Sequence, residues 1–183
     1  MANRTGTYIA FDGLGKKNPA ESDFKYYATM QAWSAGENID FKFVNSHDKT
    51  AAVRDTSLRS TLESRIRERL AASKNCIVIL SSETRKSGSM LSYEIEKAVD
   101  YYEIPLICVY TGREKINAPS KFSNRWPNAL TTRINSGAAD AIHIPFKKEI
   151  LLNAINRFSV NGNSPGGALV IYTNKAQEEM NSK

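Results

Sequence analysis

Short apolar runs alternate along the chain with longer segments in which apolar residues recur every three or four positions. The clearest run is residues 77–80, Ile-Val-Ile-Leu, which is typical of a parallel strand buried on both faces. A helical stripe follows it, through Leu91, Ile95, Val99 and Tyr102. Repeated strand and helix units of this size favour an α/β fold with a parallel, doubly wound sheet and right-handed crossovers.

The same patterns predict the remaining elements. The predicted strands cover residues 7–11, 39–44, 77–80, 104–110 and 141–144. The predicted helices cover residues 24–33, 54–70, 89–102 and 147–158. Residues 111–136 lie between the predicted strands 104–110 and 141–144. They contain Pro119, Trp126 and Pro127, which indicate a loop or short helices over the sheet edge.

The pattern predicts one domain and a tail. Residues 1–160 hold all the strand and helix units, and we find no internal repeat. Residues 161–183 begin with a glycine- and proline-containing linker and continue into the apolar run 168–172. We expect this tail to form either an extra edge strand or an interaction arm.

Composition adds the protein class. With 183 residues, 41% hydrophobic and 24% charged, the chain resembles an ordinary globular protein. No run approaches the roughly 18 apolar residues of a membrane helix, and the N-terminus lacks a signal-peptide core. Cys76 and Cys108 lie within apolar strands, where cysteine acts as a small hydrophobe. We therefore expect a cytoplasmic protein with no disulfide and no membrane partner.

The charge balance indicates which classes of ligand the protein favours. Lys and Arg number 25 against 19 Asp and Glu, a net charge of +6 that favours anionic ligands such as a nucleotide. The densest arginine group lies in the predicted helix 54–70, with Glu63 and Glu68 between its members. Interleaved charges are typical of a solvated helix face, so we expect no nucleic-acid partner.

Several common sites are excluded. Gly13 and Gly15 match neither the P-loop spacing nor the dinucleotide-binding glycine pattern. A phosphorelay receiver would need an acidic cluster that includes an aspartate at the end of the third strand, but here Leu80 is followed by Ser-Ser-Glu. His47 lies in a predicted loop, whereas His143 is expected to be a hydrogen-bonded strand residue. We predict no metal site, and the sequence assigns no Ser-His-Asp triad.

Glu94 is the strongest candidate for chemistry. It follows a strand and a hydroxyl-rich loop in which Ser87 and Ser89 are N-cap candidates, so it is expected in or near the first helical turn. It lies about 60° from Leu91 around the helix, at the edge of the buried stripe and at a pocket mouth. A carboxylate there is kept ionised by the helix dipole and suits stabilisation of an oxocarbenium-like sugar.

Several segments together resemble a known family. The run Thr7-Tyr-Ile-Ala-Phe-Asp-Gly13 resembles the first box of Toll/interleukin-1 receptor (TIR) domains. The bacterial TIR-like family that includes ThsB of Thoeris anti-phage defence is similar over roughly residues 5–110. The segments that carry the resemblance are residues 7–13, 45–48, 54–55, 73–82, 89–95 and 104–107.

The resemblance implies a flavodoxin-like, three-layer fold with a five-stranded parallel sheet in the order 2-1-3-4-5. It also implies cleavage of the nicotinamide–ribose bond of NAD, which is the substrate, with no other cofactor, and release of a cyclic ADP-ribose-type messenger that acts on a downstream effector. Glu94 matches the essential glutamate of the enzymatic members. The resemblance further implies substrate-binding residues, which are Phe11, Asp12, Ser46, His47, Asp48, Ser82, Ser87 and Tyr93.

Two other functions stay open at this point. A nucleoside deoxyribosyltransferase-like enzyme uses a similar sheet and a glutamate near a sugar carbon, but it would not need the net positive charge. A non-catalytic TIR-like interaction module would assemble through its surfaces as a homo-oligomer. In that case Glu94→Gln would leave function intact.

Overall fold

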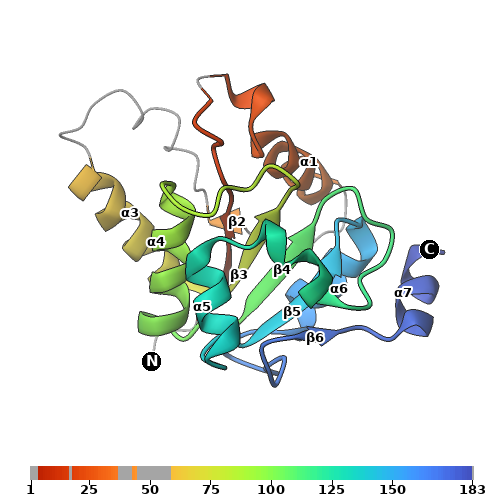
Figure 1. Cartoon of the computed structure of the whole chain (residues 1–183). Coiled ribbons are helices and arrows are strands. Elements are labelled where there is room, and N and C mark those ends of the chain that lie inside the picture. Colours follow the sequence, from red (N-terminus) through yellow and green to blue (C-terminus); the bar gives the residue numbers. More distant parts are fainter. Residues whose placement is uncertain (1–3, 17, 37–42, 45–58, 183) are drawn as a thin grey trace.

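A six-stranded, fully parallel sheet forms the centre of the molecule (Figure 1). The computed structural model describes residues 4–16, 18–36, 43–44 and 59–182 of the chain. The strand order is β2-β1-β3-β4-β5-β6. The strands are Gly6–Ala10 (β1), Phe43–Val44 (β2), Ser73–Leu80 (β3), Leu106–Tyr110 (β4), Ala141–Pro145 (β5) and Val170–Ile171 (β6).

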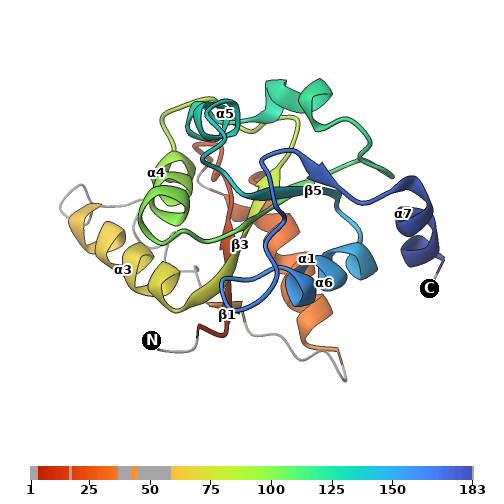
Figure 2. The ribbon, with the colours of Figure 1, turned by 90° about the horizontal axis from the view of Figure 1, so that it is seen from below.

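Helices cover both faces of the sheet, which makes three layers (Figures 1 and 2). The helices are Phe24–Ser34 (α1), Arg59–Ala71 (α3), Met90–Glu96 (α4), Asn128–Asn135 (α5), Lys148–Arg157 (α6) and Asn174–Asn181 (α7). Shorter turns are the 3-10 segments Pro19–Glu21 and Pro119–Arg125, and the π-helical turn Lys97–Tyr101 that extends α4. No helix in the described part of the chain has the length and apolarity needed to cross a membrane.

Alternation along each strand produces two cores. Along β1 and the residue that follows it, Tyr8 and Ala10 face α3, α4 and α5, whereas Ile9 and Phe11 face α1 and α6. The five residues of β4 are all buried, as expected for a strand covered on both faces. Each layer of helices therefore has its own apolar contact with the sheet, and polar side chains between the layers must find partners inside the protein.

The structure confirms the α/β, flavodoxin-like fold with its predicted strand order and extends it at one edge. β6 comes from the tail and pairs in parallel with β5, through Ile142 with Val170 and His143 with Ile171. Of the predicted strand 39–44, only residues 43–44 are described. The tail also contains α7, a helix that the sequence analysis missed.

A buried hydrogen-bond chain joins the tail to the sheet. Trp126 Nε1 donates to the hydroxyl of Tyr110 at 2.7 Å, and that hydroxyl lies 2.8 Å from His143 Nδ1. His143 Nε2 lies 2.9 Å from the carbonyl oxygen of Ala168, just before β6. Burial lowers the pKa of His143 to about 4, so the ring is neutral. The prediction that His143 is a hydrogen-bonded strand residue is confirmed.

A second polar contact fastens α7 to the loop after β4. The side chain of Gln177 is buried and pairs with the backbone of Ile116, accepting from its N–H and donating to its carbonyl, each at 3.0 Å. Gln177 also donates to the carbonyl of Tyr172 at 2.9 Å. A side-chain amide carries an acceptor oxygen and an NH2 group with two donor hydrogens in one plane, so it can pair with a peptide group as a neighbouring strand would and still donate to a second carbonyl.

Candidate functional site

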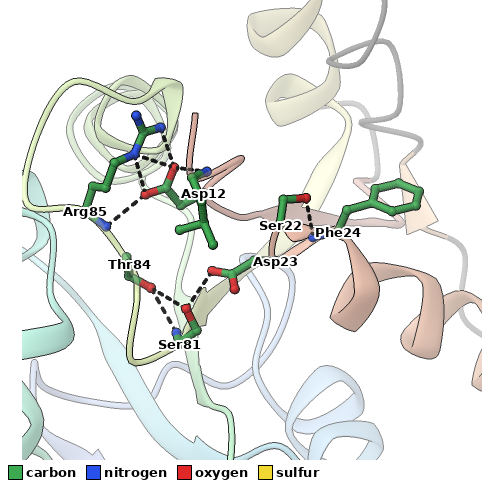
Figure 3. Close-up of polar contacts among 8 residues, drawn as sticks. Asp12, Ser22, Asp23, Phe24, Ser81, Thr84 and Arg85 are labelled. Carbon is green, nitrogen blue, oxygen red and sulfur yellow. Dashed lines mark hydrogen bonds and ion pairs between the residues drawn. The ribbon is translucent and has the colours of Figure 1, made fainter. Parts of the chain in front are cut away.

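The carboxyl ends of β1 and β3 carry a partly buried ion pair between Asp12 and Arg85 (Figure 3). The Asp12 side chain is fully buried, and Arg85 Nη2 lies 2.6 Å from its Oδ1. The Arg85 backbone N–H donates to Oδ2 at 2.8 Å, and the Leu14 N–H donates to Oδ1 at 2.9 Å. Burial acts to raise the pKa of Asp12, but the hydrogen bonds and charge of Arg85 outweigh it and hold the pKa below its ordinary value.

A second carboxylate, Asp23, lies at the same edge, and no cation of the described residues forms an ion pair with it. It precedes α1, yet its side chain turns away from the helix and accepts a hydrogen bond from Ser81 Oγ at 3.0 Å (Figure 3). The backbone N–H of Ser81 donates in turn to Thr84 Oγ1 at 2.9 Å. Burial raises the pKa of Asp23 to about 6, and the negative charges of Asp12 and Glu83 act in the same direction. This carboxyl group therefore changes its charge near neutral pH.

Glu94 lies deeper in the protein than expected. Its side chain is 0% exposed, and Oε1 accepts a hydrogen bond of 2.5 Å from the hydroxyl of Tyr8 in the middle of β1. α4 begins at Met90, so Glu94 is in the second turn, where the helix dipole has little effect. The prediction of a position at the edge of the buried stripe was wrong, because the residue reaches Tyr8 on the sheet face.

The contact with Glu94 also affects the pKa of the Tyr8 hydroxyl. Burial raises the pKa of Tyr8 well above its ordinary value, and the charge and hydrogen bond of Glu94 add to this effect. Tyr8 therefore keeps its proton and acts as a donor to the carboxylate. A fixed donor orients the carboxylate of Glu94 and stabilises its negative charge inside the core.

Tyr93 occupies a different place from its neighbour Glu94. It is half-buried on the surface shared by α3 and α4, where its hydroxyl accepts a hydrogen bond of 2.9 Å from Arg67 Nη1. The ammonium group of Lys97 lies 5.5 Å from the centre of its ring. Tyr93 and Glu94 therefore point toward different partners, α3 and β1 respectively.

The other candidate residues are spread over the same edge. Phe11 packs against Phe24 and Tyr27 on the α1 side of the sheet, with ring centroids 6.2 and 5.7 Å away. Ser82 and Ser87 are exposed in the loop between β3 and α4. The candidates Ser46, His47 and Asp48 lie outside the described residues. The structure thus gathers Asp12 with the β3–α4 loop, and it places Glu94 below that edge.

Comparison with known protein families decides what this arrangement belongs to. A family model described as Thoeris protein ThsB, TIR-like domain, matches residues 8–116. The chain belongs to this family. The match begins at Tyr8 and includes Asp12, Arg85 and Glu94, so both polar centres lie within the ThsB TIR-like region.

The family match covers the first four strands, from Tyr8 of β1 onward, and ends in the loop after β4. It ends at Ile116, the residue whose backbone pairs with Gln177. α5, β5, α6, β6 and α7 follow that point, and they complete the sheet next to the ThsB TIR-like region. The predicted resemblance, given as roughly residues 5–110, is confirmed.

Sequence reasoning missed four members of these polar centres, namely Tyr8, Asp23, Ser81 and Arg85. Asp23 and Ser81 had a visible signal, since Asp23 precedes a predicted helix and Ser81 directly follows a predicted strand. Arg85 had none, because its partner lies 73 positions away. Tyr8 looked like an ordinary apolar strand residue, although buried tyrosine hydroxyls usually have a partner.

Proposed function

We propose that this chain cleaves the nicotinamide–ribose bond of NAD and releases a cyclic ADP-ribose-type messenger in Thoeris anti-phage defence, with Glu94 as the catalytic residue. The observation that carries the proposal is the pairing of Glu94 with Tyr8. The Glu94 carboxylate, which matches the essential glutamate of the TIR-like enzymes by resemblance, is held inside a low-dielectric core by a short hydrogen bond of 2.5 Å. Carboxylates in such surroundings interact with developing positive charge more strongly than in water.

In the proposed reaction, the bond between the ribose anomeric carbon and the nicotinamide nitrogen breaks, and its electron pair leaves with neutral nicotinamide. Glu94 stabilises the oxocarbenium-like ribose that forms. A nucleophile from the same ADP-ribose then bonds to the anomeric carbon and loses a proton. Tyr8 keeps the carboxylate oriented through both steps. Water must be excluded for cyclisation to compete with hydrolysis.

The burial of Glu94 has a consequence for this proposal. Because none of the side chain is exposed, the ribose reaches it only after the side chains that cover it have moved. We therefore propose that catalysis follows a conformational step, as in enzymes whose sites are completed on activation. The exposed Ser82 and Ser87 then bind ribose hydroxyls or phosphate, and Asp12 holds the Arg85 side chain beside them.

Two further candidates take simpler roles. Phe11, which packs against Phe24, forms an aromatic wall of the site on the α1 side of the sheet. Tyr93, next to Glu94 on α4, lies on the side of the site that faces α3. The diffusible product would connect the protein to its effector without a direct contact between the two.

The test compares wild type with Glu94→Gln in NAD turnover, using purified protein and lysate from phage-challenged cells. Products are separated by chromatography with mass detection. Glu96→Gln is the matched control, because Glu96 is an exposed glutamate two positions along the same helix. Nicotinamide release that Glu94→Gln abolishes and Glu96→Gln retains supports the proposal. A product lighter than ADP-ribose by one water supports cyclisation.

One observation favours a second candidate, a non-catalytic interaction module. The complete burial of Glu94 is also what a structural carboxylate would show. In that case neither preparation releases nicotinamide in a Glu94-dependent way, and defence survives Glu94→Gln. A nucleoside supplied in place of NAD tests the deoxyribosyltransferase-like activity in the same assay.

A further inference from the structure

Arg125 places a positive charge at the carboxyl ends of two strands. Arg125 is the last residue of the 3-10 segment Pro119–Arg125, and it is only 7% exposed. Nη1 donates to the carbonyl oxygen of Thr111 at 2.9 Å and reaches that of Leu80 at 3.4 Å. Within residues 59–182 and the other described ranges, no carboxylate forms an ion pair with it. A buried cation without a carboxylate is costly unless another anion compensates for it.

A second guanidinium lies against the same aromatic ring. Arg113 is exposed and stands 4.7 Å from the centre of the Phe122 ring, whereas Arg125 stands 5.7 Å from it. Burial lowers the pKa of Arg125, and the charge of Arg113 acts in the same direction. Neither a hydrogen bond nor an ion pair engages Arg113 in the described part of the chain. Two cations on one ring repel each other, and a shared anion would relieve that repulsion.

The position of this pair relative to the acidic residues gives the edge a polarity. Asp12 and Asp23 lie where β1 and β3 end, whereas Arg125 binds carbonyls at the ends of β3 and β4. Ligands of open α/β sheets bind at this edge. Arg85 offsets the charge of Asp12, whereas Arg113 and Arg125 have no carboxylate partner within the described residues, so the excess positive charge that attracts a phosphate group lies one strand further along.

We propose that Arg113 and Arg125 form a binding site for the diphosphate group of a nucleotide. The inference rests on the proposed function, and it orients the substrate. The diphosphate of NAD lies over the β3 and β4 ends, and the positively charged nicotinamide ring lies toward the acidic side. Guanidinium groups suit this role because they bind phosphate oxygens through two parallel N–H donors.

The test measures binding, so it does not depend on catalysis. Isothermal titration calorimetry of the full chain uses ADP-ribose, inorganic pyrophosphate and adenosine as probes. Arg113→Gln should weaken ADP-ribose and pyrophosphate binding by about tenfold or more, because each loses a charge-assisted hydrogen bond. Adenosine binding should not change. Lys121→Gln is the matched control, since Lys121 is an exposed cation in the same segment and its replacement alters the net charge equally.

A second variant keeps the inference falsifiable at the buried position. Arg125→Lys retains the charge and loses the paired donors, and it should also weaken pyrophosphate binding while its thermal melting shows a folded protein. Equal affinities of Arg113→Gln, Lys121→Gln and wild type for ADP-ribose would overturn the proposal, as would no binding of either phosphate probe. Arg113-dependent binding, with no Glu94-dependent nicotinamide release from either the purified protein or the lysate of phage-challenged cells, would uphold this site and reject the proposed reaction.

Discussion

Asp12 and Asp23 lie at the same edge of the sheet and are equally buried, yet their surroundings act on them in opposite directions. Asp12 accepts hydrogen bonds from the guanidinium of Arg85, and its pKa is lowered. Asp23 accepts one from the hydroxyl of Ser81, and its pKa is raised to about 6. Burial alone therefore does not decide the charge of a carboxylate; the nearest donor does.

The largest expected effect is on the pH dependence of stability, and it isolates Asp23. The folded protein keeps the Asp23 proton up to about pH 6, whereas the unfolded chain releases it near the ordinary value of 3.8. The folded state thus binds more protons between these values, and the free energy of unfolding falls as pH rises from about 4 to 6, by about 3 kcal/mol. Urea denaturation across this range should show that fall in wild type.

Asp23→Asn is the control for this fall. It cannot ionise, so its free energy of unfolding should lack the decrease between pH 4 and 6. Asp12 should act with the opposite sign, because a lowered pKa contributes stability that is lost only as pH falls below the ordinary carboxyl range. Parallel pH profiles of wild type and Asp23→Asn would contradict the comparison.

The next effect comes from removing the guanidinium of Arg85, which binds Asp12. Arg85→Met leaves Asp12 buried without its guanidinium, and we expect a loss of about 2 kcal/mol in the free energy of unfolding. This is below the usual cost of breaking a buried pair, because the Arg85 side chain is 38% exposed. The double variant Asp12→Asn with Arg85→Met should recover part of that loss. Additive losses in the double variant would show that the two groups are not coupled.

Glu94 extends the comparison to a third buried carboxylate, one whose donor is a phenol. Tyr8→Phe keeps the ring and removes the hydroxyl, so we expect a loss of about 1.5 kcal/mol in the free energy of unfolding. Tyr93→Phe is the matched control. Tyr93 is next to Glu94 on α4, and its hydroxyl accepts a hydrogen bond from the exposed Arg67. Equal losses in the two variants would show that the hydrogen bond to Glu94 contributes no more to the free energy of unfolding than the surface hydrogen bond of Tyr93.

The smallest effect sharpens the role of Ser81. Ser81→Ala removes the one hydrogen bond that lowers the pKa of Asp23, so that pKa should rise further. The cost at neutral pH should be about 1 kcal/mol. A carboxyl-carbon NMR titration of Asp23 measures the shift directly. A pKa that stays unchanged or falls would show that the hydroxyl does not stabilise the charged form.

Most of the fold follows from local patterns. The buried strands β3 and β4 were predictable because their apolar runs are short and uninterrupted, and β5 because isoleucines flank its one polar residue, His143. α6 was predictable because its apolar residues recur at helical spacing. α7 was not, because it is largely polar and its buried anchor is Gln177, a residue that hydrophobicity patterns treat as exposed.

The candidate site was predictable only in part, for a related reason. Asp12 and Glu94 stand beside recognisable strands and glycines, so the sequence marks them. Their partners Arg85 and Tyr8 lie 73 and 86 positions away, and only the packing of β1 against β3 and α4 brings them together. The depth of Glu94 depends on the same packing. Contacts of this range are set by the tertiary structure, which periodicity does not encode.

The clamp between Gln177 and Ile116 also bears on how the protein is made. The two residues are 61 positions apart, so on the ribosome the loop after β4 emerges about 3–12 s before its partner, at usual elongation rates. During that interval the peptide group of Ile116 has to be satisfied by water, and Arg113, three residues upstream, lacks its final support. A stop codon or fusion placed within α7 should therefore affect the loop that carries Arg113 and Ile116, which was translated long before it.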